Sequence, residues 1–205
     1  MNKGNAAFVV GASGHGKSVV SVLLTSGFEI SAILDDDPDT WGESVLGVNV
    51  TGPILKRIDE IDTPGIVGIG DNANRKAQAE EMLEVEWLTL IYEGAYVNPS
   101  ARIGPGSVVF PGAVIGADVV VGKHAIVSGN CTIGHDTQVS DYAQIAPGVQ
   151  VAGGVTIGEG AMLGIGCCVV PGIAIGDWAI VGAGCTVVRD VAPNSTVLGV
   201  AAKER

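Results

Sequence analysis

A histidine followed directly by an aspartate, His135 and Asp136 in the segment IGHDTQ, is the pair in this sequence best suited to acid–base chemistry. A histidine titrates near neutral pH, and a neighbouring carboxylate can orient the imidazole and raise its basicity. Such a pair can act as a general base toward an amine or a hydroxyl. Taken alone, it could equally be two ordinary exposed polar residues.

A glycine-rich segment near the N-terminus, GASGHGKS from Gly11 to Ser18, lies between two apolar stretches. A strand, a glycine turn and a helix in that order place backbone N–H groups at a helix N-terminus, where they can hold a phosphate. Asp35 and Asp36 end the next apolar stretch, AILDD, and could accept hydrogen bonds from ribose or sugar hydroxyls. The alternative is that the glycines only permit a tight turn and the carboxylates are solvated.

The same segment satisfies the Walker A pattern GxxxxGK[ST]. A P-loop domain that hydrolyses ATP or GTP usually needs well over about a hundred residues of sheet and helices. The region before residue 91 is shorter than that, so we expect ligand binding here and not nucleotide hydrolysis.

The chain from Ile91 onward is built on a period of six. An aliphatic residue recurs at every sixth position as far as Val187, and a second, small or β-branched residue follows each one four positions later. Two inward positions per hexad, with glycines between them, predict short strands joined by tight corners, three hexads to a coil of 18 residues. This is a parallel β-helix, whose handedness the period does not define.

The 18-residue coil relates His135 to Gly153, because Gly153 comes one coil later at the same corner. Its backbone N–H could lie near the imidazole and stabilise an oxyanion. With His135 as base and Asp136 as the orienting carboxylate, this gives the three groups that acyl transfer requires. Three of the four cysteines, Cys131, Cys167 and Cys185, fall in the inward register and are unsuited to act as covalent nucleophiles.

The first ninety residues alternate between strand and helix patterns and predict a small parallel-sheet domain. We expect two domains: residues 1–90, a Rossmann-like domain, and residues 91–205, a parallel β-helix with a C-terminal tail. The family resemblance described next defines the handedness of the β-helix and the ligands of both domains.

Charge and composition exclude several classes of function. The net charge of −11 disfavours nucleic acid and anionic membranes as partners. No apolar run approaches the roughly 18 to 20 residues of a membrane span, and the first ten residues lack a signal-peptide pattern, so we expect a cytoplasmic protein. The cysteines show no CxxC spacing, and His124 and His135 fall at separate corners, so no metal site is expected. No carboxylate follows His124, which we expect at the surface or in a subunit contact.

The motifs GASGHGK, LDDDP, GIGDNANRK, IGHDTQVSDYAQIAPGV, AGGVTIGEGAMLGIG and GVAAK extend over nearly the whole chain. Together they resemble the sialic acid O-acetyltransferase-like sugar acyltransferases, above all the bacterial nucleotide-4-amino-sugar N-acetyltransferases of the bacillosamine and perosamine type. The resemblance implies a homotrimer of left-handed β-helices used in glycan biosynthesis, with acetyl-CoA as co-substrate between neighbouring prisms. It also implies direct transfer of the acetyl group to the 4-amino group of a nucleotide-linked 4-amino-4,6-dideoxy sugar, with UDP the first choice of nucleotide and GDP-perosamine the second.

Site residues follow from the resemblance by position. His135 is the general base, Asp136 its partner, and Gly153 the amide that meets the thioester carbonyl. The nucleotide-sugar site comprises Gly11, Ser13, Gly14, His15, Asp35, Asp36 and Gly70. The acetyl-CoA site comprises Gln144, Gly153, Ile165, Ala183 and Lys203. Gln144 departs from the family pattern, because relatives often have a second histidine there, and GVAAK departs from the usual GVPAK.

Two other functions remain open at this point. A sugar O-acetyltransferase would use the same base on a hydroxyl, and a non-catalytic protein could use a trimeric β-helix as a scaffold. The sequence does not define the nucleotide, the sugar carbon that bears the amine, or the glycan that receives the product.

Overall fold

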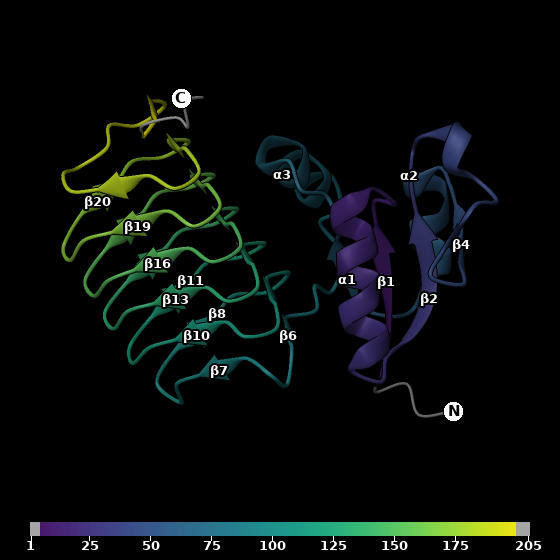
Figure 1. Ribbon diagram of the computed structural model, residues 1–205. Coiled ribbons are helices and arrows are strands. Elements are labelled where there is room, and N and C mark those ends of the chain that lie inside the picture. The colour runs from purple at the N-terminus through teal and green to yellow at the C-terminus, as the bar shows by residue number, and fades with distance from the viewer. Residues whose placement is uncertain (1–4, 200–205) are drawn as a thin grey trace, which may run out of the picture. The chain divides into compact units, whose positions relative to one another are not determined.

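The computed structural model describes residues 5–199, and the chain divides into two compact units between Leu90 and Ile91. The two units are drawn in the colour gradient of Figure 1. None of the helices among the described residues is long and apolar enough to cross a membrane.

The first unit is a five-stranded sheet with strand order β3-β4-β2-β1-β5, parallel except for the β3–β4 pair. Its central strand β1 reads AAFVV and is buried beyond its first residue, as expected of a parallel strand covered on both faces. Helix α1 packs on β1 and β2 (Figure 1). The strands are β1 (Ala6–Val10), β2 (Glu29–Leu34), β3 (Ser44–Val45), β4 (Val48–Thr51) and β5 (Gly65–Val67), and the helices are α1 (Gly14–Thr25), α2 (Ile54–Arg57), α3 (Asn72–Glu81) and the 3₁₀ turns η2 (Pro38–Thr40) and η3 (Ile58–Glu60).

The carboxyl ends of β1, β2 and β5 meet at one edge of this sheet, because the three strands are parallel and adjacent. The loops that leave this edge are the glycine-rich segment after β1, the acidic segment after β2 and the GIGDN segment after β5. The Gly11 N–H donates a hydrogen bond to the Leu34 carbonyl (2.7 Å), which holds the first two loops together. The sequence motifs of the N-terminal region are therefore gathered at one edge.

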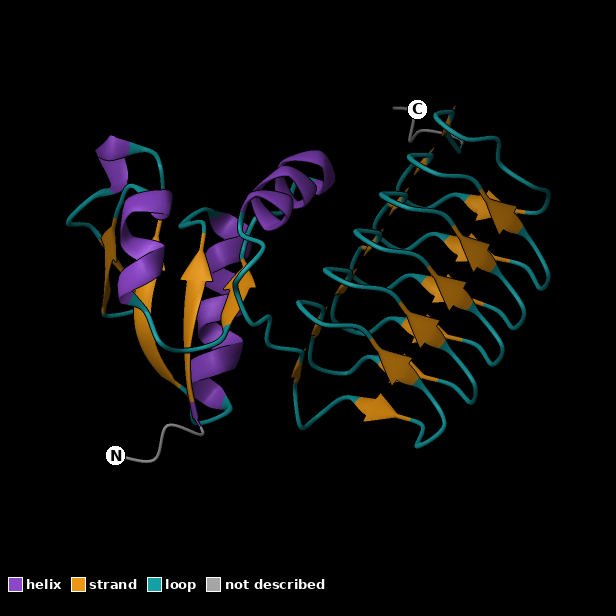
Figure 2. Cartoon of the chain, turned by 180° about the vertical axis from the view of Figure 1, so that it is seen from behind, coloured by secondary structure: helices purple, strands orange, loops and turns teal. Residues whose placement is uncertain are grey.

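The second unit is a left-handed parallel β-helix, in which two-residue strands stack coil upon coil (Figure 2). Residues 18 apart pair with one another, for example Ile133 with Val151, so each turn of the chain forms one triangular coil. The first face holds β7 (Tyr96–Val97), β10 (Val114–Ile115), β13 (Thr132–Ile133), β16 (Gln150–Val151), β19 (Cys168–Val169) and β22 (Thr186–Val187). The second holds β8 (Arg102–Ile103), β11 (Val120–Val121), β14 (Gln138–Val139), β17 (Thr156–Ile157) and β20 (Ala174–Ile175). The third holds β6 (Leu90–Ile91), β9 (Val108–Val109), β12 (Ile126–Val127), β15 (Gln144–Ile145), β18 (Met162–Leu163), β21 (Ile180–Val181) and β23 (Thr196–Val197).

The predicted fold class, a Rossmann-like region followed by a parallel β-helix, is confirmed. The aliphatic position of each hexad and the small position four residues later line one continuous core, in which Cys131, Cys167 and Cys185 are buried. Burial raises the pKa of the Cys131 thiol, and it raises the pKa of Cys167 to about 12. Thiols held protonated in a core are poor nucleophiles.

The expectation that His124 lies at the surface was wrong. Its side chain is 3% exposed and stacks on Tyr142, with ring centroids 5.5 Å apart and an interplanar angle of 4°. His124 has a left-handed backbone (φ 51°), and its ring lies over Gly106, where an added Cβ would come 2.3 Å from Nδ1. The His124 ring therefore covers the neighbouring coil instead of pointing into solvent.

Candidate active site

The His135–Asp136 pair lies at the corner that follows β13. His135 Nδ1 and Asp136 Oδ2 are 2.7 Å apart, and both side chains are largely exposed, at 71% and 65%. Asp136 has a left-handed backbone (φ 59°), and its N–H donates to the Ala117 carbonyl of the preceding coil (3.0 Å). When Nδ1 donates its proton to the carboxylate, Nε2 is the unprotonated nitrogen that can accept a proton.

Gly153 lies directly beside the imidazole, in the coil that follows. A Cβ at this position would come 2.6 Å from His135 Nε2 and 2.7 Å from Cε1, so no side chain fits there while the ring keeps its place. The N–H of Gly154 donates to the His135 carbonyl (2.8 Å), which fixes the two corners to each other. Within residues 5–199 no hydrogen bond from the Gly153 N–H is found, so this donor is left for a ligand oxygen.

The residues expected to contact acetyl-CoA fall into separate groups within one chain. Ile165 and Ala183 share one corner of the prism, where the Gly184 N–H donates to the Ile165 carbonyl (2.8 Å). Gln144 belongs to β15 on the third face, whereas His135 and Gly153 follow strands of the first face. Lys203 lies outside the described residues.

A cavity of about 480 Å³ opens at the edge of the first sheet where the motif loops gather. Of the residues expected to bind a nucleotide sugar, it is lined by Gly11, Ser13, Asp35, Asp36 and Gly70. Gly14 and His15 do not line it. The residues that sequence analysis missed are Ile54, Ile69, Asp71, Asn74, Ala77 and Gln78.

The two aspartates of this cavity bind the backbone of their own loops. Asp35 accepts hydrogen bonds from the N–H groups of Ala12 (2.7 Å) and Asp37 (2.9 Å), one on each carboxylate oxygen. Asp36 accepts the N–H of Ile54 (2.8 Å) through Oδ1. Asp35 therefore shapes the loops around the glycine turn, and Asp36 Oδ2 is the better placed of these oxygens to meet a hydroxyl group.

His15 belongs to the support of the cavity and not to its lining. Burial, and to a smaller degree the charge of Arg75, lowers the pKa of His15 from 6.5 to about 4, so the side chain is neutral at pH 7. Arg75 is itself 1% exposed and donates to the carbonyls of Ile69 (3.0 Å) and Gly70 (3.1 Å). Arg75 thus fixes the loop after β5, a role that the motif GIGDNANRK did not reveal.

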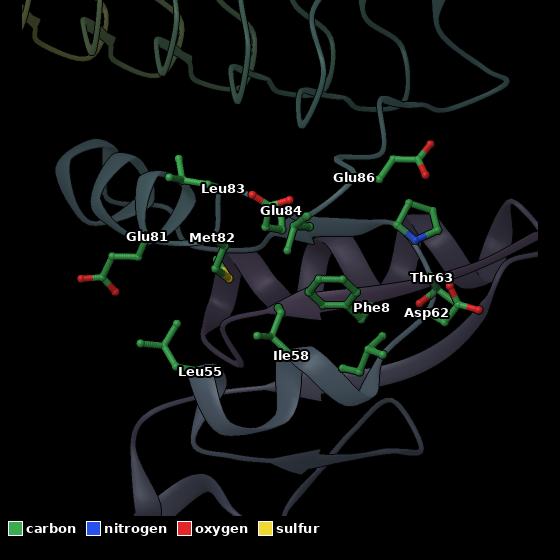
Figure 3. Close-up of a pocket in the computed structure, with 13 residues that line it drawn as sticks. Phe8, Leu55, Ile58, Asp62, Thr63, Glu81, Met82, Leu83, Glu84 and Glu86 are labelled. Atoms are coloured by element: carbon green, nitrogen blue, oxygen red, sulfur yellow. The ribbon is translucent and has the colours of Figure 1, made fainter.

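A second cavity of about 570 Å³ in the first unit contains none of the expected site residues (Figure 3). Its floor is apolar and includes Phe8 and Met82, and its rim carries carboxylates such as Glu81, Glu84 and Glu86. None of the residues that line it belongs to the glycine-rich turn before α1, whose N–H groups could hold a phosphate, which makes this cavity a poor candidate for a nucleotide-linked ligand. Among the described residues, no group of three or more His, Cys, Asp or Glu side chains could hold a metal ion.

The chain is similar to known proteins over its N-terminal region and over nearly its whole length. The family model of the PglD N-terminal domain matches residues 7–82. The structure of PerB from Caulobacter crescentus, solved in complex with CoA and GDP-perosamine, is 36% identical with a TM-score of 0.90 and aligns over 97% of this chain and 96% of that one. The acetyltransferase domain of PglB from Neisseria gonorrhoeae, in complex with acetyl coenzyme A, is 33% identical with a TM-score of 0.88, over 96% and 97% of the two chains. An uncharacterized protein of Acanthamoeba polyphaga mimivirus is 33% identical over 97 residues, which span 47% of this chain and 19% of that protein.

Proposed function

Because this chain belongs to the sugar N-acetyltransferase family, we propose that it transfers the acetyl group of acetyl-CoA to the amino group of a nucleotide-linked sugar, with His135 as general base. The observation that carries this proposal is the His135–Asp136 pair held against the amide of Gly153. The acceptor we propose is the 4-amino group of a 4-amino-4,6-dideoxy sugar. UDP is the first choice of nucleotide from the sequence resemblance, and GDP is the choice that the ligand of the Caulobacter protein supports.

Each residue of the site has a defined part in this mechanism. The attacking amine loses a proton to His135 Nε2 as the carbon–nitrogen bond forms, and Asp136 stabilises the resulting imidazolium. The Gly153 N–H donates a hydrogen bond to the thioester oxygen as that oxygen becomes negative. The proton on His135 then leaves with the sulfur of CoA when the carbon–sulfur bond breaks, so the enzyme returns to its starting state.

The nucleotide sugar is assigned to the first unit, residues 1–90. The cavity at the sheet edge lies beside the N-terminus of α1, where backbone N–H groups favour a diphosphate. Ser13 precedes this helix without capping it through its side chain, so its hydroxyl can turn toward a ligand. Asp36 Oδ2 is the proposed acceptor for a ribose or sugar hydroxyl.

A homotrimer is part of the proposal, because one chain separates the residues assigned to acetyl-CoA. Met162, Ile165 and Ile180 form an exposed apolar strip on and beside the third face, which another copy of the chain would cover. Packing of two prisms side by side would bring the corner of His135 in one copy near the Ile165 corner of the next.

The test is thiol release from acetyl-CoA by the purified protein, with UDP- and GDP-linked 4-amino sugars and their 4-hydroxyl analogues as acceptors. We expect turnover with an amine and loss of turnover in a His135→Asn variant that still assembles and binds CoA. Unchanged turnover in that variant would eliminate His135 as the base. Turnover only with the hydroxyl analogues would identify an O-acetyltransferase, and CoA binding or assembly without turnover on any acceptor would favour a scaffold.

A further inference from the structure

Thr137 places a hydroxyl group inside the core of the β-helix, two residues after His135. Its position in the hexad is the small inward one, which elsewhere in the repeat holds alanine, valine, isoleucine or cysteine, with Ser107 as the other hydroxyl. Thr137 is 0% exposed and is surrounded by the apolar core. A buried hydroxyl must find hydrogen-bond partners to offset the loss of hydration.

The partners of Thr137 lie on either side of Gly153. Thr137 Oγ1 donates to the Ala152 carbonyl at 3.1 Å and accepts the N–H of Val155 at 3.4 Å. The Ala152 carbonyl and the Gly153 N–H are opposite ends of one planar trans peptide group. A carbonyl held toward the core leaves the Gly153 N–H pointing away from the core, at the corner where the imidazole lies beside Gly153. A hydrogen bond to that carbonyl also polarises the peptide and strengthens its N–H as a donor.

Ser107 makes the same two hydrogen bonds at a different corner, where the outward N–H donates to a carboxylate of this chain. Ser107 Oγ donates to the Gly122 carbonyl (2.7 Å) and accepts the N–H of Ala125 (2.8 Å). The Gly122 carbonyl and the Lys123 N–H belong to one peptide group. This N–H donates to Asp141 Oδ1 at 2.9 Å. The Glu159 N–H makes the same bond to Asp177 Oδ1 (2.9 Å) although the inward residue at that corner is Ala143. The coil itself therefore turns this N–H outward, and the buried hydroxyl fixes the carbonyl and polarises the peptide.

The corner of Gly153 lacks that built-in acceptor. Asp141 comes 18 residues after Lys123, whereas the residue 18 positions after Gly153 is Pro171, which has no carboxylate. No acceptor among the described residues occupies the Gly153 N–H, so it can donate to an oxygen of the substrate. The Gly153 corner and the Ser107 corner differ in the acceptor that the chain places near the outward N–H. In both corners this N–H points away from the core.

We propose that Thr137 is a positioning residue, whose hydroxyl fixes and polarises the peptide of the Gly153 N–H that stabilises the oxyanion of acetyl transfer. This inference rests on the proposed function and concerns a residue that touches neither substrate. Removal of one oxyanion donor typically costs about a hundredfold to a thousandfold in kcat. A donor that is retained but loosened should cost less, about tenfold.

The experiment compares Thr137→Val, Thr137→Ser and the matched control Ser107→Ala by steady-state kinetics and thermal unfolding of the full chain. Valine occupies the equivalent inward position at Val119 and Val149, so Thr137→Val is expected to fold. We expect kcat to fall about tenfold in Thr137→Val, at unchanged KM for both substrates and with an unchanged pH profile, and to return in Thr137→Ser. Ser107→Ala loses the same kind of bond and should be destabilised similarly, with kcat unchanged.

Two results would overturn the inference. Wild-type kcat in Thr137→Val, measured where His135→Asn is inactive, would show that the hydroxyl does not strengthen the donor, while the proposed function would stand. An equal loss of kcat in Ser107→Ala would mean that any loosening of the prism slows the reaction. An inactive wild-type protein across the whole acceptor panel would instead refute the proposed function itself.

Discussion

Replacement of Gly153 by alanine tests the geometry of the site with the addition of one methyl group. The new Cβ would come 2.6 Å from His135 Nε2, 2.7 Å from Cε1 and 3.0 Å from Cδ2, whereas nonbonded carbon atoms prefer separations of about 3.5 to 4.0 Å. The ring must therefore move by about 1 Å or more, since the backbone of Gly153 is fixed within the coil. A ring that turns away cannot keep the 2.7 Å contact between Nδ1 and Asp136 Oδ2.

The expected cost falls on catalysis and not on folding. The imidazole is largely exposed and can rotate into solvent, so the free energy of unfolding should change by less than about 0.5 kcal/mol. A general base contributes about a hundredfold to ten-thousandfold to the rate, so we expect kcat to fall at least about a hundredfold when the base is displaced. Thiol release under saturating substrates measures kcat, and denaturant unfolding measures stability.

Gly154→Ala is the matched control, one residue further along the same corner. No atom lies within 4 Å of a Cβ built there, but the backbone of Gly154 is left-handed (φ 68°). Alanine in that conformation costs about 1 kcal/mol, so this variant should lose stability and keep its kcat. Full activity in Gly153→Ala would refute the reasoning, because it would mean that the ring does not lie against Gly153 in the working enzyme.

Three further predictions concern the partner of the base and the first unit. Asp136→Asn should lower kcat by about tenfold or more without a change in KM, because an amide orients the ring but cannot stabilise the imidazolium, and pre-steady-state thiol release would show whether acetyl transfer is the slowed step. Asp36→Ala should raise the dissociation constant of the nucleotide sugar about tenfold by calorimetry and leave CoA binding unchanged, since its Oδ1 holds the Ile54 N–H and its Oδ2 is the proposed acceptor for a ligand hydroxyl. Burial lowers the pKa of His15 from 6.5 to about 4, so the unfolded chain binds the proton before the folded chain does. About 3 kcal/mol of the free energy of unfolding is therefore present above pH 6.5 and is lost as the pH falls toward 4. His15→Asn should flatten that part of the stability profile, and an unchanged slope would contradict the assignment.

The β-helix could be predicted almost residue by residue because its period constrains every coil in the same way. A hexad with one aliphatic and one small inward position determines which residues face the core and which pair 18 positions apart. The same period predicts Gly153 beside His135, one coil further along, where the structure has it. The N-terminal strands could be predicted equally well, since β1 is a short, buried apolar run between turn signals.

What the sequence could not reveal depends on backbone conformation and on bonds between distant loops. His124, which no carboxylate follows, was expected at the surface or in a subunit contact, yet its side chain folds back over the neighbouring coil. Asp35 looked like a ligand for hydroxyl groups, but both of its oxygens accept backbone N–H groups. The role of Arg75 depends on carbonyls that the chain brings to it only on folding.

The exposure of His135 gives the strongest physical reason for assembly. An imidazole that is 71% exposed lies in water, where hydrogen bonds to a developing oxyanion are weak and solvent competes for the base. An effective site must exclude that water, and the corner of a single prism offers no wall to do so. The substrates can cover part of it, and an apolar strip that includes Ile165 and Ile180 lies on the same prism without a cover from the described residues of its own chain. A second copy that buries the strip and encloses the corner would satisfy both requirements at once, so assembly and catalysis should be lost together.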